Sequence, residues 1–166
     1  MPLKINIIND DSSPEWLNEE CGAEFVHKDQ KFPLKFDELG RPGLKCASFD
    51  GDADRLIYFF QNAAGDKTPA IIDGDKQFTL IMLYIKTLLS KLEISEDALS
   101  HVLVQTAYVN SRATRFLKEK GVHNEFCPTG VKNAHPIVVK YDIGANDEPN
   151  GHGTIVCKWD RVHAAL

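Results

Sequence analysis

The sequence predicts an α/β fold on the basis of three observations. Short apolar runs that favour strands, at 102–104 and 125–127, alternate with helical patterns at 114–120 and after Gly130. A longer helical pattern begins after Asp73 and precedes them. The composition, with 43% hydrophobic and 26% charged residues over 166 positions, is that of an ordinary globular protein. Strands and helices that alternate in this way favour mixed sheets packed with helices.

The N-terminal quarter of the chain predicts two short strands and one helix. Residues 4–9 are an apolar run that ends in turn residues, which indicates a strand. A helix is expected to start at Pro14, with Ser13 as its N-cap. Residues 23–27 favour a second strand. The polar segment 28–43, which contains prolines and glycines, favours a loop.

Two β-rich runs, 45–49 and 55–60, flank the acidic segment 50–54. They predict a pair of strands that the acidic segment joins as a turn. The polar stretch 61–69 follows the second run and is a candidate domain boundary.

The longest helical pattern in the chain begins after Asp73. Asp73 stands where an N-cap belongs, and Asp75 lies in the first turn, where a carboxylate meets the positive end of the helix dipole. Both aspartates are therefore assigned to the helix and not to a second metal site. In the helix after Gly130, Pro136 is expected to cause a kink or an interruption. The apolar residues that recur near helical spacing in the long pattern are Phe78, Leu80, Ile81, Leu83, Tyr84, Leu88 and Leu92.

The charge and the cysteines narrow the class of protein. A net charge of −5 disfavours nucleic-acid binding, which usually needs a basic face. No apolar run approaches the ~20 residues that span a bilayer, and the first residues lack the features of a signal peptide. The four cysteines lie far apart without a CxxC pair, so we expect reduced thiols. These features together predict a cytoplasmic protein with no nucleic-acid or membrane partner.

The acidic segment Asp50-Gly51-Asp52-Ala53-Asp54 carries aspartates at alternate positions. In a tight turn, this spacing can bring alternate carboxylates to one side, where their negative charges repel one another. A divalent cation relieves this repulsion, and hard oxygen ligands suit Mg²⁺, Mn²⁺ or Ca²⁺. A solvated turn would explain two aspartates, but three in alternation after a strand favour a metal site.

The residues around the three aspartates do not match two known kinds of acidic loop, the EF-hand and the loop of haloacid-dehalogenase-type phosphatases. An EF-hand loop needs glycine at its sixth position and glutamate at its twelfth, where this sequence has Arg55 and Gln61. A haloacid-dehalogenase-type phosphatase also has an Asp-x-Asp after an apolar strand, but it normally has Thr or Val in the place of Asp54. A phosphatase with Asp50 as its nucleophile therefore stays as the weaker alternative.

The whole segment 46–55 resembles the metal-binding loop of the α-D-phosphohexomutases. The branch that it resembles most acts on N-acetylglucosamine phosphates. The resemblance implies two partial domains of this family, residues 1–64 with the metal loop and residues 65–157 with a sugar loop, and an unmatched tail at 158–166. Further segments resemble the same family in the same order, namely 17–23, 72–76, 104–108, 114–117, 128–132 and 150–154.

The resemblance also implies roles for individual residues. Members of the family interconvert hexose 6-phosphates and 1-phosphates through a bisphosphorylated sugar, with a phosphoserine as the phosphate donor and Mg²⁺ in the acidic loop. Asp50, Asp52 and Asp54 are thereby implied as Mg²⁺ ligands, Arg55 as a residue near the phosphate, and Lys132 as a residue facing the active-site cleft. The segment 148–152 resembles the sugar-specificity loop, and the implied sugar contacts are Glu148, Asn150 and His152.

The 166 residues contain no Thr-Ala-Ser-His-Asn-like loop, in which the family carries its phosphoserine. The Ser100-His101 pair precedes an apolar strand and lacks the Asn-Pro that should follow it. The family's C-terminal phosphate-anchoring loop is missing as well. We therefore assign no catalytic residue and expect the chain to be inactive by itself. The alternative is that the chain is a non-catalytic module that binds metal or sugar phosphate, or that it is a truncated partner protein. In either case, incompletely buried apolar surface favours self-association.

Overall fold

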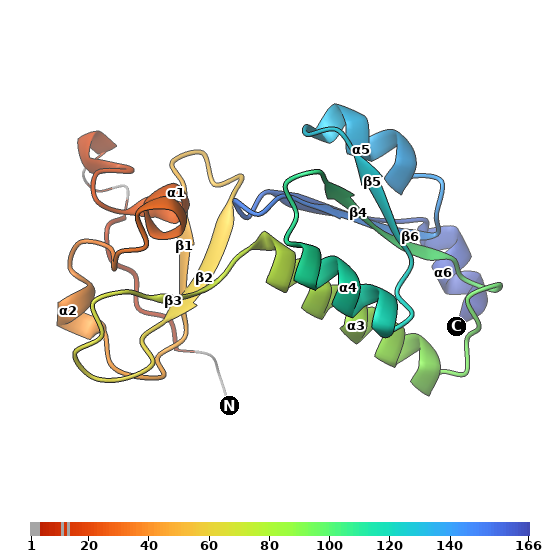
Figure 1. The fold of residues 1–166 in the computed structure, drawn as a ribbon, viewed down its shortest axis with the longest axis horizontal. Helices are drawn as coiled ribbons and strands as arrows, with labels where there is room; N and C mark the ends of the chain where they lie inside the picture. Colours follow the sequence, from red (N-terminus) through yellow and green to blue (C-terminus); the bar gives the residue numbers. More distant parts are fainter. Residues whose placement is uncertain (1–3, 11, 13) are drawn as a thin grey trace. The chain divides into compact units, whose positions relative to one another are not determined.

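The computed structural model describes residues 4–10, 12 and 14–166, so the expected helix cap Ser13 lies outside the described residues. The internal contacts divide the chain after Asp73 into two units, which are described separately (Figure 1). Among the described residues, no helix is long and apolar enough to cross a membrane.

The first unit is built on a three-stranded antiparallel sheet. β1 (Cys46–Phe49) pairs with β2 (Leu56–Phe60), and β2 pairs in turn with β3 (Ala70–Ile72). The β1–β2 hairpin confirms the two strands predicted around the acidic segment, which is its connecting turn. One face of the sheet packs on a small apolar core that consists of Ala23, Val26, Phe36, Ile57 and Phe59.

The strand predicted at 23–27 is wrong, because this segment is helical. α1 (Gly22–Glu24) continues into the π-helical turn η2 (Phe25–Asp29). Ala23 and Val26 are three positions apart, and both are fully buried in the core. Residues at this spacing share one face of a helix, whereas in a strand they would point to opposite faces.

The predictions for the segments before and after residues 23–27 also need correction. Residues 4–10 form no strand, and Ile5 and Ile7 are 69% and 74% exposed, so this run buries no apolar face that would hold it against a sheet. The helix expected at Pro14 is reduced to the 3₁₀ turn η1 (Pro14–Trp16). The expected loop at 28–43 contains the short helix α2 (Phe36–Leu39).

The second unit is a four-stranded sheet with helices on both faces. Its strand order is β5-β4-β6-β7, in which β4 runs parallel to β5 and β6 while β7 runs antiparallel to β6. The elements follow one another as α3 (Gly74–Lys91), β4 (His101–Thr106), α4 (Ser111–Glu119), β5 (Asn124–Cys127), α5 (Val131–Val138), β6 (Ile143–Asp147), β7 (Gly153–Cys157) and α6 (Trp159–Ala165).

Alternate residues of β4 serve the two faces of this sheet. Leu103 packs with Phe78 of α3 and Leu117 of α4, whereas Val102 and Val104 pack with α5. Figure 1 shows the same arrangement, with α3 and α4 together on one face of the sheet and α5 on the other. The fold class predicted from the sequence, α/β with mixed sheets packed with helices, is confirmed.

The helices and strands predicted for this unit are present, but some bounds differ. Pro136 lies inside α5, which runs through it and ends at Val138 instead of being interrupted. The predicted boundary after residue 64 falls inside the first unit, because β3 pairs with β2. The expected tail at 158–166 contains α6, which packs against an apolar cluster formed by Leu89, Leu99 and Ile143.

Asp142, directly before β6, connects α6 to the start of the sheet. Its Oδ2 accepts hydrogen bonds from the N–H and the hydroxyl of Ser100, at 2.9 and 2.8 Å. Its Oδ1 lies 3.4 Å from Nε of Arg161 and 3.8 Å from Nζ of Lys158. Burial raises the pKa of Asp142, but the hydrogen bonds from Ser100 and the charge of Arg161 outweigh this effect and hold the pKa below its ordinary value.

We predict that Asp142→Asn lowers the free energy of unfolding by about 1–3 kcal/mol near neutral pH. Because the pKa of Asp142 is lower in the folded chain, its carboxylate stabilises the fold above the unfolded pKa of about 4. This contribution is lost as the pH falls through the folded pKa. Urea unfolding followed by circular dichroism across this pH range measures the effect, with the exposed Asp160→Asn as control. If the free energy of unfolding of Asp142→Asn differs from that of the parent by the same amount at every pH, the stabilising role of the Asp142 carboxylate is contradicted.

Candidate functional site

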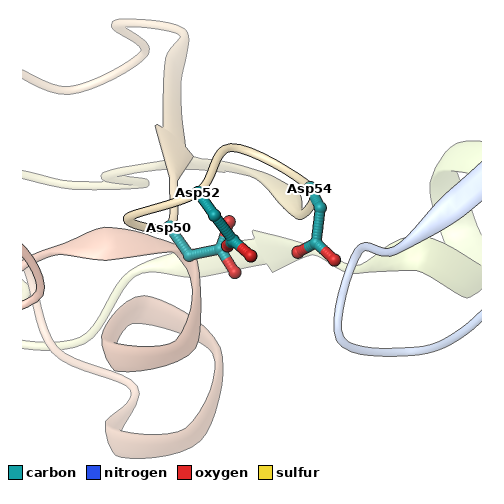
Figure 2. Close-up of side chains that lie close together, drawn as sticks. All are labelled: Asp50, Asp52 and Asp54. Carbon is teal, nitrogen blue, oxygen red and sulfur yellow. The ribbon is translucent and has the colours of Figure 1, made fainter.

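The turn between β1 and β2 brings the three aspartates together. The N–H of Ala53 donates to the carbonyl oxygen of Asp50 at 3.0 Å, and Ala53 has a left-handed φ of 59°. The chain reverses there, and the side chains of Asp50, Asp52 and Asp54 point to the same side of the loop (Figure 2). One carboxylate oxygen from each aspartate lies within 4.8 Å of the corresponding oxygens of the other two.

This set of oxygens fits a small divalent cation. Mg²⁺ binds oxygen at about 2.1 Å in octahedral geometry, so neighbouring ligands lie about 3.0 Å apart and opposite ligands about 4.2 Å apart, and the three carboxylates would have to draw closer together around the ion. The side chain of Asp50 is 10% exposed, while Asp52 and Asp54 are exposed and leave the outer side of the cluster open. In the described part of the chain, no other group of three or more His, Cys, Asp or Glu residues is placed to hold a metal ion.

Arg55 lies against the same carboxylates. Its N–H donates to Oδ1 of Asp50 at 3.1 Å, and its Nε lies 3.5 Å from Oδ2 of Asp50 and 3.7 Å from Oδ1 of Asp54. Its Nη1 donates to Oε2 of Glu24 at 3.1 Å. The pKa of Glu24 is lowered, mainly by a hydrogen bond from Lys28 and further by the charge of Arg55. The guanidinium is therefore held at the edge of the loop, where it offsets part of the repulsion among the aspartates.

The predicted sugar-loop residues lie in the tight turn between β6 and β7. The N–H of Glu148 donates to the carbonyl oxygen of His152 at 2.9 Å, and the N–H of Gly151 donates to the carbonyl oxygen of Glu148 at 3.0 Å. The side chain of Asn150 accepts from the N–H of His152 at 3.0 Å and donates to Oε2 of Glu148 at 3.2 Å. All three predicted sugar contacts are thus brought together in one hydrogen-bonded turn.

Glu148 also connects this turn to the start of α5. Its Oε1 accepts a hydrogen bond from the N–H of Gly130 at 3.2 Å, and Gly130 is the N-cap residue of α5. A carboxylate is stabilised at a helix N-terminus, because free N–H groups and the positive end of the dipole face it. Lys132, predicted to face the cleft, is an exposed residue in the first turn of α5.

Gly74, the first residue of α3, supports the turn that carries the predicted sugar contacts, a role that the sequence analysis missed. Its N–H donates to the carbonyl oxygen of Pro149 at 3.2 Å, and a Cβ at this position would lie 1.9 Å from the carbonyl oxygen of Glu148. Only glycine allows so close an approach. Asp75 is buried and accepts from the N–H of Asn110 at 2.8 Å, which joins the starts of α3 and α4. The sequence carries no separate signal for these roles, because the helix start at Asp73 and Asp75 accounts for the Asp-Gly-Asp segment by itself.

Both units match models of one enzyme family. Residues 2–57 match the model of phosphoacetylglucosamine mutase AMG1, domain II, and residues 73–165 match that of domain III. The phosphoacetylglucosamine mutases of Oryza sativa subsp. japonica and Homo sapiens are 42% and 43% identical to the chain over 160 and 153 residues. These alignments cover 93% and 92% of the chain, but only 28% and 27% of the two relatives.

Solved structures give the same result. The Aspergillus fumigatus N-acetylphosphoglucosamine mutase in complex with GlcNAc-6P and magnesium matches 96% of this chain and 31% of its own, with a TM-score of 0.84 and 35% identity. An apo-form N-acetylglucosamine-phosphate mutase matches 90% of this chain and 32% of its own, with a TM-score of 0.80 and 37% identity. The haloacid-dehalogenase-type alternative is therefore set aside. The chain, which spans about 28% of the length of its curated relatives, belongs to the phosphoacetylglucosamine mutase family of the α-D-phosphohexomutase superfamily.

Proposed function

We propose that the chain supplies the metal-binding and sugar-binding loops of a phosphoacetylglucosamine mutase. The proposed reaction of the complete enzyme interconverts N-acetylglucosamine 6-phosphate and 1-phosphate through a bisphosphorylated sugar, for the synthesis of UDP-N-acetylglucosamine. The observation that carries the proposal is the convergence of three carboxylates in the loop of the first unit. Because the relatives extend well beyond the matched region, turnover is proposed for the complete enzyme and ligand binding for this chain.

In this proposal, Asp50, Asp52 and Asp54 hold Mg²⁺, each through one carboxylate oxygen. The cation supplies neutralisation of the charge that develops on the transferred phosphoryl oxygens, while the protein positions the reacting groups. Arg55 contributes a second positive charge beside the loop and binds a phosphate oxygen, and its ion pair with Glu24 fixes its direction. The presence of magnesium in the solved Aspergillus fumigatus complex supports this assignment.

Glu148, Asn150 and His152 are proposed to bind the sugar. Each oxygen of Glu148 accepts one hydrogen bond within the protein, from Gly130 or from Asn150, and keeps acceptor capacity for a sugar hydroxyl. These two bonds also fix the plane of the carboxylate, which makes it selective for the positions of the hydroxyl groups. Lys132 offers a positive charge near the start of α5 to the phosphate of the substrate.

Two further expectations belong to the same proposal. The free thiols of the described cysteines are in keeping with the reducing cytoplasm, which we propose as the compartment. Self-association is proposed through an exposed apolar stripe whose residues recur every four positions. Leu80, Tyr84 and Leu88 lie on α3, and Leu92 directly follows its end.

Asp52→Asn is predicted to weaken Mg²⁺ binding by about tenfold or more, because it removes one charged ligand of three. Isothermal titration calorimetry with MgCl₂ on the 166-residue chain measures this loss. The matched control is Asp37→Asn, which removes an exposed carboxylate of α2 in the same unit and should leave the isotherm unchanged. Equal isotherms for the parent and Asp52→Asn would remove the metal site from the proposal.

Glu148→Gln and Gly74→Ala are both predicted to weaken binding of N-acetylglucosamine 6-phosphate by about tenfold or more. The first removes the charge that accepts the sugar hydroxyls, and the second pushes the turn away from α3. Saturation-transfer NMR on the N-acetyl methyl protons reports binding, and circular dichroism checks that each variant is folded. Glu119→Gln on α4 serves as the control. A full transfer signal for Glu148→Gln contradicts the proposed sugar loop.

A further inference from the structure

Asn18 reaches the acidic loop from a segment far away in the sequence. An ideal Cβ built on Gly51 would lie 2.6 Å from Nδ2 of Asn18, so the amide of Asn18 packs directly against the Cα of Gly51. Gly51 lies between Asp50 and Asp52, two of the three proposed Mg²⁺ ligands. A group that fixes the backbone of Gly51 therefore fixes the spacing of two carboxylates at once.

The same amide packs against a second glycine on its other side. An ideal Cβ on Gly22 would lie 2.6 Å from Oδ1 of Asn18 and 3.5 Å from the carbonyl oxygen of Phe49, the last residue of β1. Real Cβ atoms essentially never approach other heavy atoms within 3.0 Å. The amide thus occupies the space that the missing side chains of Gly22 and Gly51 leave between the two segments.

The backbone around Asn18 is anchored and adopts a conformation that suits asparagine. Asn18 has a φ of 65°, in the left-handed region, where asparagine is several-fold enriched among non-glycine residues. On either side of it, the N–H of Glu19 donates to the carbonyl oxygen of Trp16 at 3.0 Å, and the carbonyl oxygen of Glu20 accepts from Leu34 at 2.9 Å. The amide is therefore presented to the loop by a fixed segment, although the residue as a whole is exposed.

We propose that Asn18 is a positioning residue of the metal loop. Wedged between Gly22 and Gly51, its amide holds the backbone between Asp50 and Asp52 at the spacing that a small cation requires. The inference rests on the proposed metal-binding function of this loop. Because Mg²⁺ demands near-ideal octahedral geometry while Ca²⁺ tolerates irregular sites, Asn18 matters more for Mg²⁺ than for Ca²⁺.

The experiment uses Mn²⁺ as the probe on the 166-residue chain. Electron paramagnetic resonance counts free Mn²⁺, and displacement by MgCl₂ or CaCl₂ gives the two affinities for the parent and for Asn18→Ala. We expect Asn18→Ala to weaken Mg²⁺ binding by about tenfold, as is common for residues that orient ligands, and Ca²⁺ binding by less than about threefold. The matched control is Asn9→Ala. Asn9 is also left-handed, with a φ of 53°, but its Nδ2 donates to the carbonyl oxygen of Leu34 at 2.7 Å.

A double-mutant cycle tests the contact itself. The φ of Gly51 lies outside the left-handed region, and the nearest atoms to an added Cβ belong to Asn18, so Gly51→Ala conflicts with Asn18 rather than with its own backbone. Gly51→Ala should therefore weaken Mg²⁺ binding in the parent and weaken it much less in the Asn18→Ala background.

The outcomes separate this inference from the function on which it rests. If the parent chain binds no Mn²⁺, the proposed metal site and the role of Asn18 both fall. If the parent binds Mn²⁺ but Asn18→Ala behaves like Asn9→Ala, or loses Mg²⁺ and Ca²⁺ binding equally, the positioning role is overturned and the metal site stands. Additive effects of Asn18→Ala and Gly51→Ala also overturn it.

Discussion

Three carboxylates within 4.8 Å of one another repel, and much of the first unit serves to hold them there. The turn that gathers them depends on the left-handed backbone of Ala53, a conformation that costs about 1–2 kcal/mol for a residue other than glycine. Arg55 offsets part of the repulsion among the aspartates, because its guanidinium lies against two of the carboxylates. The hairpin stays in register because β2 is packed on the core through Ile57 and Phe59. In our proposal, the same contacts that stabilise the unit also prepare the loop for a cation.

In the second unit, the turn between β6 and β7 is also held by close packing at glycines, where the absence of a side chain lets other atoms approach the backbone. Gly74 allows α3 to contact the proposed sugar loop, and Gly153 at the start of β7 leaves room for the ring of Phe78. Hydrogen bonds from Gly130 and Asn150 then orient the carboxylate of Glu148. In both units the proposed metal and sugar ligands lie in short turns, while Asn18, Gly74 and Gly130, which help to place them, come from distant segments. Because the supporting contacts come from outside the turn, a short turn can hold its ligand-binding side chains in a defined geometry.

The sequence allowed the groups within each turn to be predicted, because their members are neighbours along the chain. It did not indicate that Gly74 supports the sugar loop, nor that Asn18 reaches Gly51, since these contacts join segments that only the fold brings together. The helical segment at 23–27 was predicted as a strand because five residues are too few to separate a period of two from one of 3.6. In the folded chain this segment is helical, because a helix buries Ala23 and Val26 together against the core. Local chemistry was therefore easier to predict than the contacts that support it.

The central claim is that the acidic loop is a metal site prepared by the fold of the first unit. Paramagnetic broadening by substoichiometric Mn²⁺ in ¹H–¹⁵N spectra of the chain tests it most directly, since broadening falls steeply with distance from the ion. The account predicts that the amides of residues 50–55 and 18–22 broaden first and recover when excess Mg²⁺ is added. Broadening spread over exposed carboxylates of both units, with no preference for residues 50–55, would contradict it.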